Sequence, residues 1–102
     1  MIRMTARPVH PGEILNEEFL VPLGLSAGAL AKAVDVPRTR IERVRDERTG
    51  ITADTALRLA AYFGTTPEFW MNLQASYDLA VAGAAMKDRG PIAPRHSAEG
   101  VG

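Results

Sequence analysis

A run of arginines between positions 38 and 48 carries the densest positive charge in this sequence. Five of the twelve basic residues lie there, namely Arg38, Arg40, Arg43, Arg45 and Arg48. The planar guanidinium of arginine forms paired hydrogen bonds to a phosphate or to the edge of guanine. The cluster is therefore typical of a nucleic-acid contact. The alternative is a solvated helix face whose charge is balanced by Glu42, Asp46 and Glu47.

The segment from Ala27 to Asp46 has the pattern of two helices joined by a tight turn. Apolar side chains fall where two crossing helices share a small core, at Leu30, Val34, Val36, Ile41 and Val44. Ala31 is expected where the helices come closest, and Asp35 at the turn, where the backbone needs φ > 0. Pro37 is expected at the first position of the second helix, because its fixed φ suits a helix start.

The second helix, predicted from Pro37 to about Asp46, has a polar outer face. With Ile41 and Val44 turned to the core, this face carries Arg38, Thr39, Arg40, Glu42 and Arg43. A helix that enters the DNA major groove presents such side chains near its N-terminus, within reach of base edges and phosphates. Together with the core pattern, this favours a DNA-recognition helix.

The composition indicates one domain without covalent cross-links. The chain has 102 residues, a formal net charge of zero and no cysteine. Without a net charge, DNA binding must come from a local patch, and its affinity should depend on dimerisation. The lack of cysteine excludes a disulfide framework. No apolar run approaches the roughly 18 residues that span a bilayer, and no signal peptide is evident, so we expect a soluble cytoplasmic chain.

Start and stop signals predict three further helices around this motif. The first opens near Pro11, turns Ile14, Leu15 and Phe19 inward and ends at Pro22 and Gly24. Ser26 caps the helix from Ala27 to Val34, within which Gly28 is costly unless something packs closely against it. A further helix runs from the cap Thr52 to Gly64, with an apolar face of Ala56, Leu57, Leu59, Ala60 and Phe63.

The last predicted helix opens at Thr66 and Pro67 and extends to about Met86. Its apolar stripe consists of Phe69, Trp70, Leu73, Tyr77, Ala80, Val81 and Ala84. A small core can hide Phe69 but not the whole stripe. We therefore predict a homodimer surface made of Trp70, Leu73, Tyr77 and Val81. The alternative is that the whole stripe belongs to the core of one chain.

These elements divide the chain into three parts. Residues 1–9 are expected to form an extended arm, residues 10–87 the DNA-binding and dimerisation domain, and residues 88–102 a flexible tail. No catalytic, metal or cofactor site is evident. His10 and His96 have no partners spaced for a metal site, and His10 is better explained as part of a helix start. The adjacent Glu17 and Glu18 diverge on a helix and cannot form an acid/base pair.

Four segments carry a family resemblance. HPGEIL from His10, EEFLVPLGLS from Glu17, GITADTALRLA from Gly50 and FGTTPEFWMNLQASYDL from Phe63 closely resemble the HigA-type antitoxins. These are a branch of the XRE/Cro-like helix-turn-helix regulators, and the likeness covers about residues 8 to 82. It implies an all-α, five-helix, lambda-repressor-like domain that dimerises, binds a palindromic operator and represses its own operon. It also implies a partner, a HigB-type toxin that cleaves mRNA and that the antitoxin holds inactive.

The resemblance assigns roles within the recognition helix. Arg38, Thr39 and Arg43 occupy positions that face bases in such regulators, and Arg40 and Arg48 occupy positions of phosphate contacts. The sequence departs from the family inside this unit. Ala27 replaces a polar residue, Asp35 a glycine, Pro37 a Ser or Thr cap, and Asp46-Glu47 an Asn-Gly pair. We predict that DNA binding is retained, with more of it resting on the five arginines and a steep salt dependence.

Two other functions compete with the antitoxin. One is a solitary XRE-type repressor without a toxin, which only a neighbouring gene or a co-purifying partner would separate from the antitoxin. The other is a helical interaction module that has lost DNA binding, which predicts partner binding without salt-sensitive DNA affinity. An enzyme is the weakest interpretation.

Overall fold

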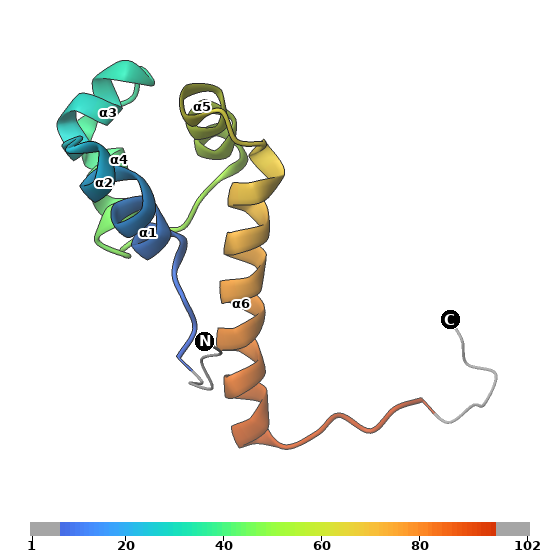
Figure 1. The fold of residues 1–102 in the computed structure, drawn as a ribbon. Helices are drawn as coiled ribbons and strands as arrows, with labels where there is room; N and C mark the ends of the chain where they lie inside the picture. The colour runs from blue at the N-terminus through green and yellow to red at the C-terminus, as the bar shows by residue number, and fades with distance from the viewer. Residues whose placement is uncertain (1–6, 96–102) are drawn as a thin grey trace.

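The computed structural model describes residues 7–95, which form five helical segments and no strand (Figure 1). The first segment is continuous and consists of α1 (Pro11–Ile14), a π-helical turn (Leu15–Leu20) and α2 (Val21–Leu23). It is followed by α3 (Ala27–Ala33), α4 (Arg38–Arg45), α5 (Ala53–Phe63) and α6 (Pro67–Arg89). The predicted all-α, five-helix fold is confirmed. Of the predicted arm (residues 1–9) and the predicted tail (residues 88–102), residues 1–6 and 96–102 lie outside the described residues.

The predicted helix caps are confirmed by hydrogen bonds. The side chains of Ser26, Thr52 and Thr66 each accept the N–H of the residue three positions later, at 3.0, 3.3 and 3.1 Å. At the other ends, Gly24 and Gly64 adopt φ of 59° and 77°, the left-handed conformation that glycine adopts without strain. Local sequence signals therefore set most helix boundaries.

The first segment differs from a regular α-helix. Leu15 and Leu20 are both buried although they are five residues apart. This spacing fits the π-helical turn, in which hydrogen bonds join residues i and i+5. The turn ends two residues before Pro22, whose ring would clash with the carbonyl four residues back in an α-helix. The wider turn relieves that clash, so the helix continues through Pro22 and ends after Leu23.

The core lies between the first segment and helices α3, α4, α5 and the start of α6. Its largest fully buried side chains include Leu15, Leu30, Ile41, Leu59 and Trp70. The indole N–H of Trp70 donates to Thr65 Oγ1 at 2.8 Å. Our prediction that Trp70 lies on a dimer surface is therefore wrong. Phe69, which we expected inside, is 37 % exposed at the edge of the core.

The predicted burial of one apolar side chain in α5 is also wrong. Leu57 was expected on the inner face but is exposed, whereas its neighbours Ala56, Leu59 and Ala60 are buried as predicted. The buried stripe is narrow because α5 packs mainly against a single neighbour, α6. Leu57 lies beyond the edge of that contact.

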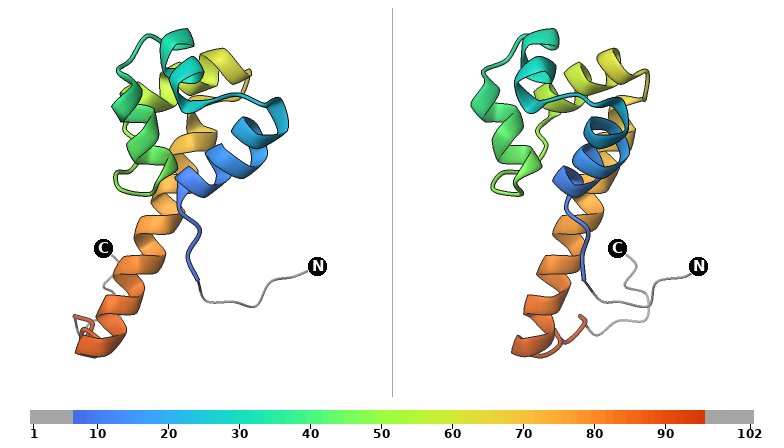
Figure 2. Two further views of the ribbon diagram at one scale, coloured as in Figure 1. Left: turned by 90° about the vertical axis from the view of Figure 1, so that its left-hand side faces the viewer. Right: turned by 60° about the vertical axis from the view of Figure 1, so that its left-hand side comes forward.

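Helix α6 is the longest element and extends past the body of the domain (Figure 2). Its first half packs on α5 and α1. Its second half continues to Arg89, three residues beyond the predicted end, with Leu79, Val81 and Met86 exposed. The domain is therefore elongated, with extents of 54 × 28 × 27 Å.

Within the described residues no single helix is long and apolar enough to cross a membrane. The first segment and α3 meet such a composition as a pair, but they are bent by 93° at their junction.

Candidate nucleic-acid interface

The predicted helix-turn-helix consists of α3, α4 and the turn between them. Asp35 has φ of 60°, as predicted, and the N–H of Val36 donates to the carbonyl of Ala31 at 3.0 Å, which closes the turn. Pro37 is not the first helical residue. It is the N-cap in an extended conformation, and α4 begins at Arg38 without a side-chain cap. Glu47, just past α4, also has a positive φ, of 63°, which the sequence did not predict.

Helix α4 has one fully buried side and one exposed side. Ile41 and Val44 are 0 % and 1 % exposed and hold the helix on the core. Arg38, Thr39 and Arg43 are exposed on the side that faces away from it. The burial of one side leaves these three side chains accessible to a partner as large as a DNA duplex.

The arginine side chains of this region differ in whether they form ion pairs or hydrogen bonds within the chain. The side chains of Arg43 and Arg48 make no hydrogen bond or ion pair with any of the residues 7–95. Arg38 forms an i, i+4 ion pair with Glu42, with Nε 3.3 Å from Oε2, and remains 70 % exposed. These three guanidinium groups are available to phosphates or bases.

Arg40 is turned toward α5 instead. Its guanidinium pairs with the carboxylate of Asp54, which also accepts from Arg58 Nε at 2.9 Å. Arg58 Nη1 in turn donates to the carbonyls of Val34 and Asp35, at 2.8 and 3.3 Å. These bonds tie α5 to both helices of the motif. Arg40 thus holds α4 in place, a role that the sequence did not reveal, and it would have to leave Asp54 to reach a phosphate.

The hydrogen bond from Arg58, and then that from Arg40, lowers the pKa of Asp54 below its ordinary value. The carboxylate therefore stays charged over a wider pH range than a free aspartate. The spacing of Asp54 and Arg58, four residues apart on one helix, is the sequence signal that could have revealed their pairing.

The first helical segment supports α4 from the other side. A Cβ on Gly12 would lie 1.9 Å from the carbonyl oxygen of Val44, so only glycine permits this approach. The N–H of Gly12 donates to Nδ1 of the buried His10 at 2.9 Å. The ring of His10 packs edge-on against Tyr77 of α6, with centroids 4.8 Å apart. His10 is therefore a helix cap and a packing residue in this structure.

The loop after α4 is fixed by α6. The N–H of Ile51 donates to Gln74 Oε1 at 2.6 Å, and a Cβ on Gly50 would lie 2.7 Å from that same oxygen. Gln74 Nε2 also donates to Asp78. The sequence did not single out Gln74, because a glutamine on a helix gives no local signal of a contact 23 residues away.

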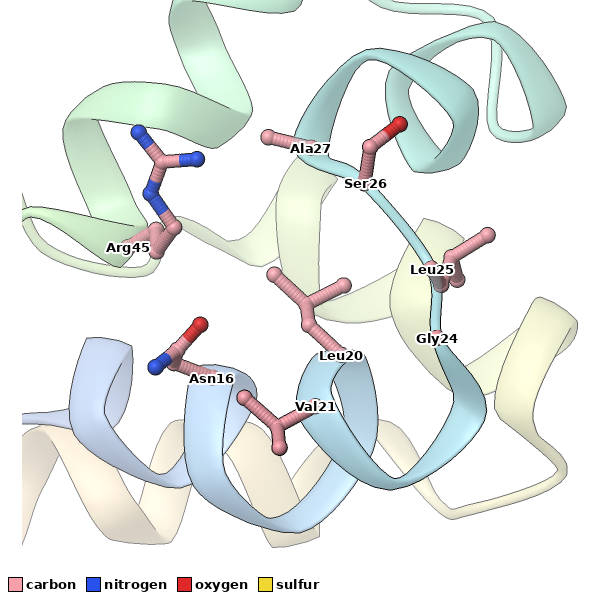
Figure 3. A pocket seen from close by; sticks show the side chains of 8 residues that line it. All are labelled: Asn16, Leu20, Val21, Gly24, Leu25, Ser26, Ala27 and Arg45. Carbon is pink, nitrogen blue, oxygen red and sulfur yellow. The ribbon is translucent and has the colours of Figure 1, made fainter.

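Arg45 lies apart from the outer face of α4. It forms an ion pair with Asp46 at 2.9 Å and lines a shallow pocket of about 330 Å³ (Figure 3). The pocket lies between the first segment, the start of α3 and the end of α4 and is lined by Asn16, Leu20, Val21, Gly24, Leu25, Ser26, Ala27 and Arg45. No three His, Cys, Asp or Glu side chains within residues 7–95 are grouped to hold a metal ion.

The four residues predicted for the dimer surface differ in burial along α6. Trp70 is in the core, as described above. Leu73 is half-buried against the core, Tyr77 is half-buried against His10, and Val81 is 45 % exposed. The accessible part of this stripe therefore lies in the second half of the helix.

Comparison with known proteins agrees with this geometry. A family model described as helix-turn-helix matches residues 17–70. Antitoxin HigA-1 of Vibrio cholerae is 43 % identical over 79 residues, which cover 78 % of this chain and 74 % of that protein. The chain belongs to the HigA family of helix-turn-helix antitoxins.

Two further proteins are closely similar to this chain, one in structure and one in sequence. The structure of the Pseudomonas aeruginosa antitoxin HigA with the higBA promoter aligns with a TM-score of 0.84 and 46 % identity, over 88 % of this chain and 100 % of that one. Virulence-associated protein I of Dichelobacter nodosus is 58 % identical over 74 residues, which are 72 % of this chain and 68 % of that protein.

Proposed function

We propose that this chain is an antitoxin that binds operator DNA through α4 and represses its own operon. The observation that carries the proposal is that α4 is buried on one side only. Ile41 and Val44 fix it to the core, while Arg38, Thr39 and Arg43 face outward. Arg48 adds a positive charge just past the helix. A similar HigA protein has been solved with the higBA promoter, which supports DNA binding by this chain.

The proposed contact surface consists of Arg38, Thr39, Arg43 and Arg48. Arg40 would add a phosphate contact only by leaving Asp54, so its first role is to hold α4 in place. Because the net charge of the chain is zero, attraction to DNA must come from this patch. Affinity should therefore fall steeply as salt rises.

The same proposal includes a homodimer formed through α6. The second half of this helix leaves the body of the domain (Figure 2), and Val81 is exposed there on the side of the predicted stripe, whereas Leu79 and Met86 are exposed on the opposite side. A helical extension of this length has little stability alone in water, so packing against a second copy would stabilise it. In a two-fold dimer the recognition helices should lie about 34 Å apart to meet successive major grooves.

The remaining partner in the proposal is a HigB-type ribonuclease toxin, which the antitoxin neutralises by binding it in the cytoplasm. The mRNA cleavage would belong to the toxin, and the antitoxin itself would not be an enzyme. Co-expression with the neighbouring toxin gene, followed by gel filtration of the purified mixture, tests this part. Recovery of a stable complex with inhibited ribonuclease supports it, and separate elution of an active toxin contradicts it.

Binding to operator DNA through α4 is tested by fluorescence anisotropy. The purified protein is titrated onto the duplex upstream of its gene and onto a shuffled duplex, over a salt series. We expect preference for the native duplex and a steep loss of affinity with salt. The double variant Arg38→Gln/Arg43→Gln should lose binding even at low salt. The matched control, Lys87→Gln/Arg89→Gln, removes two positive charges from the far end of α6 and should bind normally. Binding that survives the first variant would show that α4 is not the recognition helix.

Homodimer formation through α6 is tested by sedimentation velocity. Val81→Asp should convert a micromolar dimer to a monomer, because it places a charge within the proposed interface. Asn72→Asp adds the same charge at an exposed position on the opposite side of α6, nine residues from Val81, and should leave the dimer intact. A dimer that tolerates Val81→Asp and dissociates with Asn72→Asp would place the interface on another face.

A further inference from the structure

The side chain of Arg38 lies back toward α3 instead of projecting straight out from α4. A Cβ added to Gly28 would be 3.1 Å from Arg38 Cδ, 3.9 Å from Cγ and 4.0 Å from Nη1. Arg38 is the first residue of α4 and Gly28 is the second residue of α3. The arginine therefore crosses from one helix of the motif to the other, and the lack of a side chain at position 28 leaves its path open.

Glu42 contacts the same guanidinium group. The ion pair joins Arg38 Nε to Glu42 Oε2 at 3.3 Å, and the arginine side chain remains 70 % exposed. The first three residues of α3 are Ala27, Gly28 and Ala29, which carry no polar side chain. Positive charge at this end of α3 comes from Arg38 beside Gly28 and from Arg45 beside Ala27.

In a helix-turn-helix bound to DNA, the second helix lies in the major groove and the first helix crosses the sugar–phosphate backbone. A side chain that runs from the second helix to the start of the first is therefore directed at the groove edge. We infer that Arg38 contacts a backbone phosphate and not a base, and that Gly28 is the positioning residue that permits this orientation. This inference rests on the proposed DNA binding.

With Arg38 on a phosphate, the exposed side chains of α4 have different roles in DNA binding. A phosphate contact adds affinity for every sequence and one unit of salt dependence, whereas a base contact adds preference at one base pair. Thr39 and Arg43 are then the side chains left to read bases. An alanine at position 28 should displace the arginine by a few tenths of an ångström, because Cδ is already within 3.1 Å of the added atom.

A double-mutant cycle with Gly28→Ala, Arg38→Ala and the combined variant tests this. Each protein is titrated by anisotropy onto the native duplex, a shuffled duplex and single-base-pair variants of the native one, across a salt series. Arg38→Ala should weaken binding to all duplexes by the same factor, about fivefold at low salt, and lower the salt slope by about 1. Gly28→Ala should weaken binding by about threefold when Arg38 is present and not at all when it is absent.

The thermal unfolding midpoint of Gly28→Ala shows whether weaker DNA binding comes from a displaced Arg38 or from a less stable fold. Alanine is the better helix residue, so this midpoint should not fall below that of the wild type. Loss of preference at one base pair in Arg38→Ala would show that Arg38 reads a base and would overturn the inference. An equal effect of Gly28→Ala in both backgrounds would overturn the role of Gly28. If the wild type binds neither native nor shuffled duplex, the proposed function itself is wrong and the inference fails with it.

Discussion

Gly12→Ala is the substitution that we expect to destabilise this domain most for its size. The added Cβ would lie 1.9 Å from the Val44 carbonyl oxygen and 2.9 Å from its carbon. Contacts below 3.0 Å are not tolerated, so α1 and α4 must separate by at least 1.1 Å, the difference between 3.0 and 1.9 Å. Both partners are backbone atoms, and no rotamer change can relieve the clash.

Overpacking of this kind costs about 1–3 kcal/mol, and a rigid backbone contact belongs at the upper end of that range. We expect Gly12→Ala to lower the free energy of unfolding by about 2–3 kcal/mol. For a domain of this size that corresponds to a fall in the melting temperature of about 10–20 °C.

The assay is thermal unfolding followed by circular dichroism, with urea unfolding as a second measure. Gly83→Ala is the control, because a Cβ at that position has nothing within 4 Å and alanine favours the helix by about 1 kcal/mol. Its melting temperature should stay equal or rise. A Gly12→Ala protein that melts within about 2 °C of the wild type would refute the reasoning, because 1 kcal/mol alone shifts the midpoint by about 4–8 °C.

Three further substitutions test contacts described above. Thr65→Val leaves the buried indole N–H of Trp70 without an acceptor and should lower the free energy of unfolding by about 1–3 kcal/mol in urea, whereas an unchanged midpoint would mean that the hydrogen bond contributes nothing. Gln74→Ala should speed hydrogen exchange at the Ile51 amide, and unaltered exchange there would show that the loop is held by other contacts. Because the pKa of Asp54 is lowered in the fold, its pairing stabilises the protein above about pH 4 and is lost as the pH falls through the lower folded value. Asp54→Asn should therefore lose part of the acid dependence of the urea midpoint, and an identical pH profile would contradict this.

Signals within a few residues of one another predicted much of this fold. Ser26, Thr52 and Thr66 cap their helices because a side-chain oxygen three residues before an N–H needs no information from elsewhere in the chain. Asp35 was found in the same way, since few residues tolerate a positive φ. The accessible side of α4 also followed from local periodicity, once Ile41 and Val44 were assigned to the core.

The sequence predictions that were wrong, and the residues that the sequence did not single out, mostly depend on contacts between distant segments of the chain. Phe69 and Trp70 are adjacent, and helical spacing alone cannot show which ring the core accepts. The structure shows that the larger one enters, because Thr65 provides an acceptor for its N–H. Gly12 and Gln74 were missed for the same reason, since their partners Val44 and Ile51 are 32 and 23 positions away. The extra residue in the π-helical turn was missed because apolar spacing of five fits no regular helix.

A chain of close contacts runs from α6 to α4 without a flexible link. Tyr77 packs on His10, His10 caps the helix at Gly12, and Gly12 lies directly on the backbone of Val44. If two copies join through α6, their recognition helices are consequently held at a fixed rotation as well as a fixed distance. One base pair inserted between the operator half-sites turns one half-site by about 35° around the duplex. A rigid pair of helices cannot follow that rotation, so the spacing of the half-sites becomes part of what the protein recognises.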